Sequence, residues 1–155
     1  MSAAATPAPR GRSAGTLIDP RGPRFGAAIS SVLLAAIVLL GASTTGLALL
    51  ALAVALFAIG SVRGAQGTVQ GIVYRRWVQP RLARPERLED ARPPRFAQTV
   101  GLAVTAAGLA LGLLGVAPAV TVAAGIALVA AFLNAALAFC LGCEIYLLLG
   151  RLRTA

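Results

Sequence analysis

Histidine and lysine are both missing from the 155 residues, and all 14 basic side chains are arginines. The absence of histidine excludes haem held by histidine, metal sites built on imidazole, and proton relays that run through it. There are five acidic residues, and the only two cysteines, Cys140 and Cys143, lie three positions apart. The reactive side chains that remain are concentrated in one short segment near the C-terminus.

Charge is scarce as well. Charged residues make up 12% of the chain and hydrophobic residues 58%, and the mean hydropathy is +0.83. This composition is typical of an integral membrane protein. The 17 glycines suit helices that approach one another closely in lipid. A net charge of +9 also suggests nucleic acid, but that interpretation needs a basic face with exposed aromatics on a soluble fold. Membrane topology explains the arginines better.

Four apolar stretches predict four transmembrane helices and therefore an all-α membrane protein. The first three contain about 17 to 21 residues each, enough to cross a hydrocarbon layer of about 30 Å at about 1.5 Å per residue. The fourth is longer than a span requires. The stretches cover residues 25–42, 46–62, 96–116 and 118–149.

The arginines separate cleanly along the chain. They precede the first stretch, fill the loop 63–95 and follow the fourth stretch, whereas the two other connections, ASTT and VAPA, carry none. Because cytoplasmic loops collect arginine, we expect a multi-pass protein of the bacterial plasma membrane with this loop and both termini in the cytoplasm. The four-helix domain then covers 17–150, between a disordered tail at 1–16 and a short tail at 151–155. Cleavage as a signal peptide near 41–43 is disfavoured, because it would leave the charges on opposite sides.

The start of the first stretch returns at the start of the third. RGPRFGA at 21–27 matches RPPRFAQ at 92–98 with a separation of 71, and FAIGSV at 57–62 resembles FCLGCE at 139–144. Proline suits a first helical position because its missing N–H would be unpaired there, and a neighbouring arginine can reach lipid headgroups. We therefore expect two parallel two-helix repeats about an axis along the membrane normal. The structural residues at the two helix starts are Pro23, Arg24, Pro94 and Arg95.

The central loop has the pattern of an interfacial helix over residues 67–79. Apolar side chains recur on one helical face, and Arg75 and Arg76 point elsewhere. Tyr74 and Trp77 are expected to anchor this helix at the headgroup level. The apolar face consists of Val69, Ile72, Val73 and Trp77.

The cysteine pair is the main candidate site. On a single helix that begins at Pro118, Cys140 and Cys143 lie about 33 and 38 Å along it, at the cytoplasmic edge of the hydrocarbon. Positions i and i+3 share a face with about 5 Å between Cα atoms, within the range that a disulfide tolerates. Such a bond would cross-link almost nothing, which favours a reactive pair over a structural one. The C-terminal end of the helix and Glu144 would both disfavour a thiolate, so the pair differs from a thioredoxin active site.

Plainer interpretations stay open. The cysteines can pack as two small hydrophobic residues, and Glu144 can pair with a loop arginine. Two thiols supply too few ligands for a metal without a partner protein, so no metal or cofactor is expected. Asn134 and Gln98 are expected to donate hydrogen bonds between helices.

Three segments carry a family resemblance. LIDPRGPRFGAAIS at 17–30, RPPRFAQTVG at 92–101 and LNAALAFCLGCEIY at 133–146 resemble the small bacterial membrane family catalogued as domain of unknown function 4395, common in actinobacteria. The resemblance covers nearly the whole chain after residue 16, with FCLGCE as its marker. The family has no established activity, but it is similar in outline to four-helix membrane proteins linked with thiol redox. The resemblance implies thioredoxin-like or sulfurtransferase partners.

Three functions are consistent with these features. The first is a membrane thiol protein in which Cys140 and Cys143, beside the acid Glu144, cycle between dithiol and disulfide or carry a persulfide, with a soluble thioredoxin-like or sulfurtransferase partner. The second is a non-enzymatic scaffold that docks a partner on the basic loop. The third, a small-solute transporter, is disfavoured because the spans lack charged residues and a midplane site. The expected surroundings are a lipid bilayer without nucleic acid, and self-association stays open.

Overall fold

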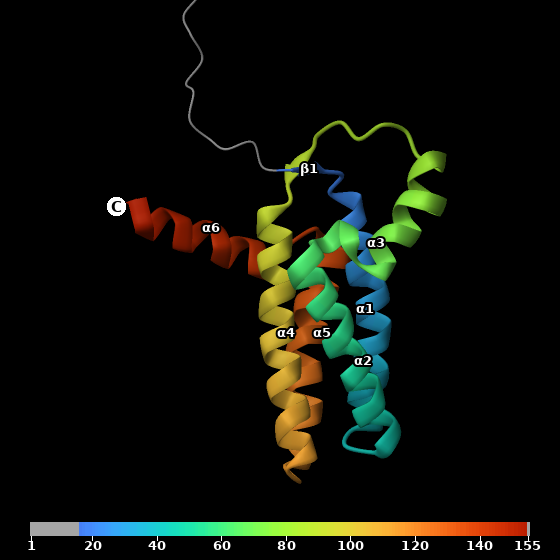
Figure 1. Ribbon diagram of the computed structural model, residues 1–155, viewed down its shortest axis with the longest axis vertical. Coiled ribbons are helices and arrows are strands. Elements are labelled where there is room, and N and C mark those ends of the chain that lie inside the picture. The colour runs from blue at the N-terminus through green and yellow to red at the C-terminus, as the bar shows by residue number, and fades with distance from the viewer. Residues whose placement is uncertain (1–15, 155) are drawn as a thin grey trace, which may run out of the picture.

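Four long helices form the body of the molecule. In this computed structural model, which describes residues 16–154, they are α1 (Arg21–Leu40), α2 (Thr44–Arg63), α4 (Arg92–Leu113) and α5 (Ala117–Leu137). All four are long and apolar enough to cross a membrane, which confirms the predicted all-α membrane fold. They run side by side as a bundle, while a further helix, α6 (Leu141–Thr154), projects to one side (Figure 1). The tail expected at 1–16 lies outside the described residues except for Thr16.

The two arginine-free connections are tight turns. Gly41, with φ of 55°, ends α1, and the hydroxyl of Ser43 accepts a hydrogen bond from the Gly46 N–H at the start of α2. Gly115, with φ of 91°, turns the chain from α4 into α5. Glycine adopts such positive φ values without the steric cost that a Cβ atom adds. The turns therefore begin one or two residues before the predicted connections.

Helices of the two halves pack across one another. The most extensive contacts join α1 to α5 and α2 to α4. At the arginine-free end the core is apolar and closely packed, and Gly108 of α4 lies directly against Ala123 of α5. Small residues at a crossing let two helix backbones approach, which is the main source of packing energy in lipid. The largest fully buried side chains are Leu34, Ile37, Leu50, Thr105 and Val120.

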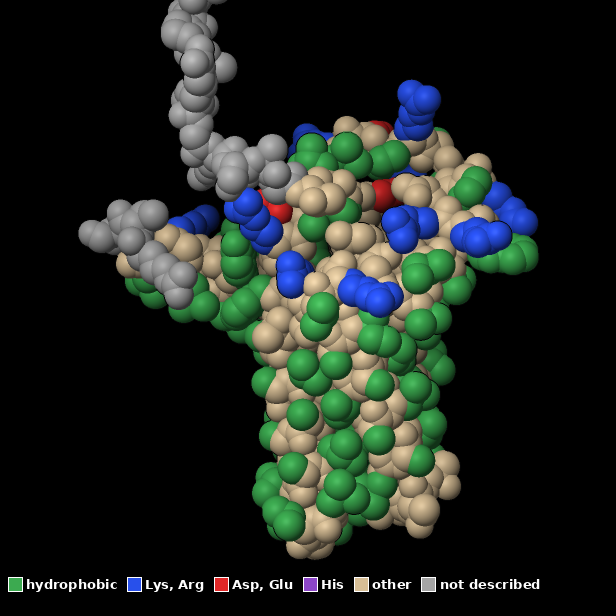
Figure 2. All heavy atoms as spheres, viewed as in Figure 1, with side chains coloured by type: hydrophobic (Ala, Val, Ile, Leu, Met, Phe, Trp, Pro, Cys, Tyr) green, Lys and Arg blue, Asp and Glu red, His purple; other side chains and the backbone are tan. Residues whose placement is uncertain are grey.

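Charged side chains gather at the opposite end. Figure 2 shows blue and red side chains on the upper part of the molecule and an apolar surface along the bundle below. A two-stranded antiparallel pair joins the halves here: β1 (Leu17–Ile18) pairs with β2 (Glu89–Asp90). We call this part of the molecule the arginine end.

The two halves share several structural details at this end. Arg21 and Arg92, the first residues of α1 and α4, each donate a backbone N–H to an aspartate two residues earlier, at 2.9 Å in both cases. In the strand pair Ile18 lies opposite Glu89, its counterpart 71 residues later. If a two-fold axis that relates the two halves passes through the strand pair, one residue must pair with its own counterpart in the other half, as Ile18 does with Glu89. The second sequence match does not correspond in space, because 57–62 lies within α2 whereas 139–144 follows the end of α5.

The central loop contains the expected helix in short segments. These are η1 (Ala65–Gly67), α3 (Val69–Val73), η2 (Tyr74–Val78) and η3 (Gln79–Arg81). Trp77 is exposed, as an interfacial anchor requires, but Tyr74 is buried. Its ring packs on Phe25 of α1 at 5.6 Å between centroids, and its hydroxyl donates to Asp19 Oδ2 at 3.0 Å. The membrane-anchoring role predicted for Tyr74 is therefore wrong, because this side chain fastens the loop to the start of α1.

The hydroxyl of Tyr74 makes the docking of this loop sensitive to alkaline pH. Burial, followed by the hydrogen bond to Asp19, raises the pKa of Tyr74 to about 12. The folded protein holds this proton more tightly than the unfolded chain, so the stabilisation is complete below the ordinary tyrosine pKa of about 10 and is lost as the pH rises through about 12. We expect Tyr74→Phe to lower the free energy of unfolding by about 1 kcal/mol and to remove this alkaline loss.

Ultraviolet titration of the phenolate checks the shift. The chain has two tyrosines, so the variant Tyr146→Phe leaves Tyr74 as the only titrating phenol. A midpoint near that of free tyrosine in this variant would contradict the buried hydrogen bond.

The fourth expected span is replaced by two helices. α5 ends at Leu137, and Ala138 has a left-handed conformation with φ of 55°. The N–H groups of Ala138 and Phe139 both bond to the Leu133 carbonyl, which closes the helix. The 21 residues of α5 already extend about 31 Å, so the remaining apolar residues exceed a hydrocarbon layer of about 30 Å. The tail expected at 151–155 belongs to α6 as far as Thr154.

α6 is an amphipathic arm at the arginine end. Most of its exposed apolar residues recur at helical spacing along one face, and Figure 2 shows hydrophobic side chains on the underside of the arm. A helix of this kind suits the boundary between headgroups and acyl chains. The face contains Leu141, Ile145, Leu148, Leu149 and Leu152.

Candidate functional site

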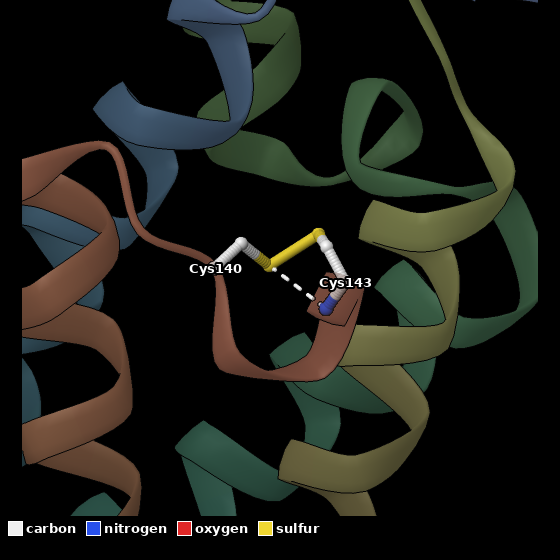
Figure 3. The surroundings of a disulfide bond; sticks show 2 residues. All are labelled: Cys140 and Cys143. Atoms are coloured by element: carbon white, nitrogen blue, oxygen red, sulfur yellow. Dashed lines mark hydrogen bonds between the residues drawn. A yellow bond between two sulfur atoms is a disulfide. The ribbon is translucent and has the colours of Figure 1, made fainter. Parts of the chain in front are cut away.

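Cys140 and Cys143 form a disulfide at the corner between α5 and α6. Their Cα atoms are 5.2 Å apart, as the i and i+3 spacing predicts. Cys140 ends the non-helical segment and Cys143 lies in the first turn of α6 (Figure 3). Both residues are half-buried.

The pair lies at the N-terminus of a helix. The Cys143 N–H donates to Cys140 Sγ at 3.3 Å, and the Glu144 N–H donates to the Cys140 carbonyl at 3.0 Å. Cys140 therefore occupies the capping position of α6, where unpaired N–H groups and the helix dipole stabilise negative charge. The expectation of a C-terminal position, which would disfavour a thiolate, is corrected by the break after Leu137. After reduction, the sulfur of Cys140 is the one that this arrangement stabilises as a thiolate.

Close packing against α4 holds the corner in place. Gly142 is buried, and a Cβ atom added there would lie 2.6 Å from both Cα and Cβ of Ala97. One turn further along α6, the ring of Tyr146 packs on Phe96 of α4 at 5.6 Å between centroids. The first turn of α6, and with it the disulfide, is thereby fixed to the start of α4.

A cavity of about 760 Å³ adjoins the disulfide. Its walls come mainly from α1, α4, α5 and the first turns of α6, with smaller contributions from α2, η1 and β2, so both halves of the bundle line it. Residues that were candidates from the sequence meet in it although they are far apart along the chain. They are Pro23, Arg24, Pro94, Gln98, Asn134, Cys140, Cys143 and Glu144.

Arg24 and Arg95 each donate a hydrogen bond to a backbone carbonyl near the C-terminal end of α5 or α2. Arg24 Nη2 donates to the Ala135 carbonyl at 3.3 Å, and Arg95 Nε donates to the Ser61 carbonyl at 2.7 Å. Each acceptor lies two residues before the last residue of its helix, α5 or α2. Both carbonyls belong to the last four residues of their helix, whose carbonyl groups have no N–H partner within the helix. The matched arginines therefore join each half to the other, and Arg95 lies outside the cavity.

The other polar candidates line the cavity. Gln98 lies against Gly60 of α2, where its side chain fills the space that a Cβ atom would occupy. Asn134 lies on α5, one turn before that helix ends. Glu144 is exposed in the first turn of α6, where a carboxylate interacts favourably with the helix dipole. The interhelical hydrogen bonds of Asn134 and Gln98, and the ion pair of Glu144, stay predictions.

The fold and the site together define a class of protein: a multi-pass membrane protein of four apolar helices with a CxxC disulfide beside a cavity at its charged end. The chain belongs to the family described as domain of unknown function (DUF4395), whose model matches residues 18–151. The match includes both cysteines and every helix except the end of α6. No curated protein and no solved structure matches the chain.

Proposed function

We propose that the protein is a thiol–disulfide exchange component of the bacterial plasma membrane, with Cys140 and Cys143 as the reactive pair. The observation that carries this proposal is the position of Cys140 at the N-terminus of α6, with its sulfur accepting the Cys143 N–H. A sulfur in this position is a good leaving group when another thiolate attacks the disulfide. A disulfide that joins residues in one turn constrains little of the fold, so a chemical role explains it better than a structural one.

The proposed partner is a soluble thioredoxin-like or sulfurtransferase protein in the cytoplasm. The cysteines lie at the arginine end, and arginine-rich segments of membrane proteins stay on the cytoplasmic side. On the same ground, the proposal assigns both termini to the cytoplasm. The partner thiolate attacks Sγ of Cys143, the sulfur of Cys140 leaves as a thiolate, and the second thiol of the partner resolves the mixed disulfide.

We further propose that the chain arose by duplication of a two-helix unit. The helix starts at Arg21 and Arg92, the aspartate caps before them and the reciprocal bonds of Arg24 and Arg95 support this. The segment α3–η2 follows α2 as α6 follows α5, and Tyr74 packs on Phe25 at 5.6 Å between centroids just as Tyr146 packs on Phe96. The two halves differ in that the cysteines occur only in the second.

Exchange with a dithiol protein tests the function. Purified protein in detergent is mixed with a reduced bacterial thioredoxin, and the thiols are then alkylated and counted by mass spectrometry. We expect reduction of the disulfide and, with a thioredoxin that lacks its resolving cysteine, a mixed disulfide mainly at Cys143. A disulfide that thioredoxin leaves intact, although a small phosphine reduces it, would overturn the proposal.

The single-cysteine variants test the activation of Cys140. Cys143→Ser retains the N–H that bonds to Cys140 Sγ, whereas Cys140→Ser leaves a thiol without that capping position. We expect alkylation about three- to tenfold faster in Cys143→Ser than in Cys140→Ser, because a hydrogen bond to a charged sulfur raises the thiolate fraction while lowering its nucleophilicity only in part. Equal rates would remove the role assigned to the N-terminus of α6.

A further inference from the structure

The cavity reaches from the disulfide far along the bundle. On α5 its lining runs from Asn134 to Ile126, a distance of about 12 Å along the helix, and on α4 from Pro93 to Val104, about 17 Å. Both helices are long enough to cross the membrane. The far part of the cavity therefore lies at the depth of the hydrocarbon, whereas the cysteines lie at its near end.

The lining changes from polar to apolar along this length. At the arginine end it includes Arg24, Gln98 and Asn134, whose side chains carry N–H donors, together with the carboxylates of Glu89, Asp90 and Glu144. Farther along it is lined mostly by apolar residues, with Phe57 and the hydroxyl of Ser30 among them. These include Val100, Gly101, Val104, Ala127, Ala130 and Ala131. Such a lining suits a ligand with a polar head that accepts hydrogen bonds and an apolar body.

The far part of the cavity reaches the lipid-facing surface. Ile126 lines it and is also 56% exposed, although it lies in the middle of an apolar helix. A molecule dissolved in the bilayer can therefore enter from the side. The cavity volume of about 760 Å³ is within the range of about 300 to 1,000 Å³ that is usual for small-molecule sites.

We propose that this cavity binds a membrane quinone, which accepts electrons from the reduced Cys140–Cys143 pair. The ring lies beside the sulfurs with its carbonyl oxygens toward the donors of Arg24, Gln98 and Asn134, and the isoprenoid tail leaves past Ile126. This inference rests on the proposed thiol exchange. The quinone is the electron acceptor that the protein needs in order to oxidise its partner repeatedly.

The reaction is balanced with the quinone as the oxidant. The two thiols of Cys140 and Cys143 lose two electrons and two protons, and the Sγ–Sγ bond forms. The quinone takes up both electrons and both protons and becomes a quinol. The soluble dithiol partner then reduces the disulfide and is itself oxidised to a disulfide, so that the cycle transfers electrons from a protein dithiol to a membrane quinone.

Oxidation of the reduced protein in nanodiscs tests the proposal. The probe is a short-tailed benzoquinone that is substituted at every ring position, so that thiols cannot add to the ring. We expect consumption of quinone in step with disulfide formation, at a rate that saturates with quinone concentration. Ala130→Phe, which fills the cavity, should weaken the apparent quinone affinity about tenfold or more. Val129→Phe, on the adjacent exposed position, should leave it unchanged.

Exchange with thioredoxin, measured on the same samples, separates this inference from the proposed function. Normal exchange combined with slow, non-saturating oxidation by the quinone would overturn the quinone site alone. Equal quinone affinity in the two phenylalanine variants, or a cavity that retains only phospholipid in native mass spectrometry, would also overturn it. Loss of thioredoxin exchange in the parent protein would overturn the proposed function together with it.

Discussion

Replacing Gly142 with alanine is expected to detach the first turn of α6 from α4. The added methyl group would lie 2.6 Å from the Cα and Cβ atoms of Ala97, so one of the two helices must move. Overpacking of this kind costs about 1 to 3 kcal/mol, which outweighs the gain of about 1 kcal/mol that alanine brings to a helix interior. Because the disulfide belongs to this turn, its sulfurs should leave the cavity.

The same substitution at Gly150 provides the matched control. Gly150 lies farther along α6, and a Cβ atom there has no neighbour within 4 Å. We expect Gly142→Ala to lower the melting temperature in detergent and to speed alkylation of the reduced cysteines, and Gly150→Ala to change neither. Similar behaviour of the two variants would show that contact with Ala97 does not hold the site.

The largest loss of stability is expected from Gly108→Val. A Cβ atom at Gly108 would overlap the Ala123 side chain and lie 3.2 Å from the Ala119 carbonyl oxygen. Valine adds two further methyl groups at the crossing of α4 and α5. The helices must separate, and in lipid their association depends on this close packing. We expect a destabilisation of about 3 kcal/mol or more.

Gly125→Val on α5 is the corresponding control. A Cβ placed at Gly125 meets no side chain and no other helix within 4 Å, so this variant carries the same helix-propensity change without the collision. Size-exclusion profiles and thermal unfolding in detergent measure both variants. A monodisperse Gly108→Val protein with the melting temperature of the Gly125→Val protein would contradict the crossing described here.

Much of the bundle could be predicted because its determinants are local. Hydropathy over about 20 residues locates the spans, and the arginines mark one end of the molecule. The matching segments 21–27 and 92–98 stand at the starts of α1 and α4, which begin at Arg21 and Arg92. Tyr74 was misplaced because an amphipathic pattern does not distinguish a side chain that faces lipid from one that packs on Phe25.

The corner that forms the site could not be predicted in the same way. The chain leaves the helix at Ala138, a residue type that ordinarily favours helix, so no local propensity indicates the break. The indication was the excess length of the stretch 118–149 over what a bilayer needs. The cavity depends on how α1, α4 and α5 cross, which no single segment encodes. Because the helix breaks at Ala138, the CxxC pair lies at the start of α6 and not near the end of a single long helix.

The oxidation state of Cys140 and Cys143 in native membranes tests the central claim most directly. Cells are quenched rapidly in acid, the thiols are alkylated, and the peptide that contains both cysteines is analysed by mass spectrometry. The proposed function predicts a mixture of dithiol and disulfide, or a persulfide, that shifts when oxidant or reductant is added before the quench. Two unmodified thiols in every condition, unchanged by oxidant, would contradict it.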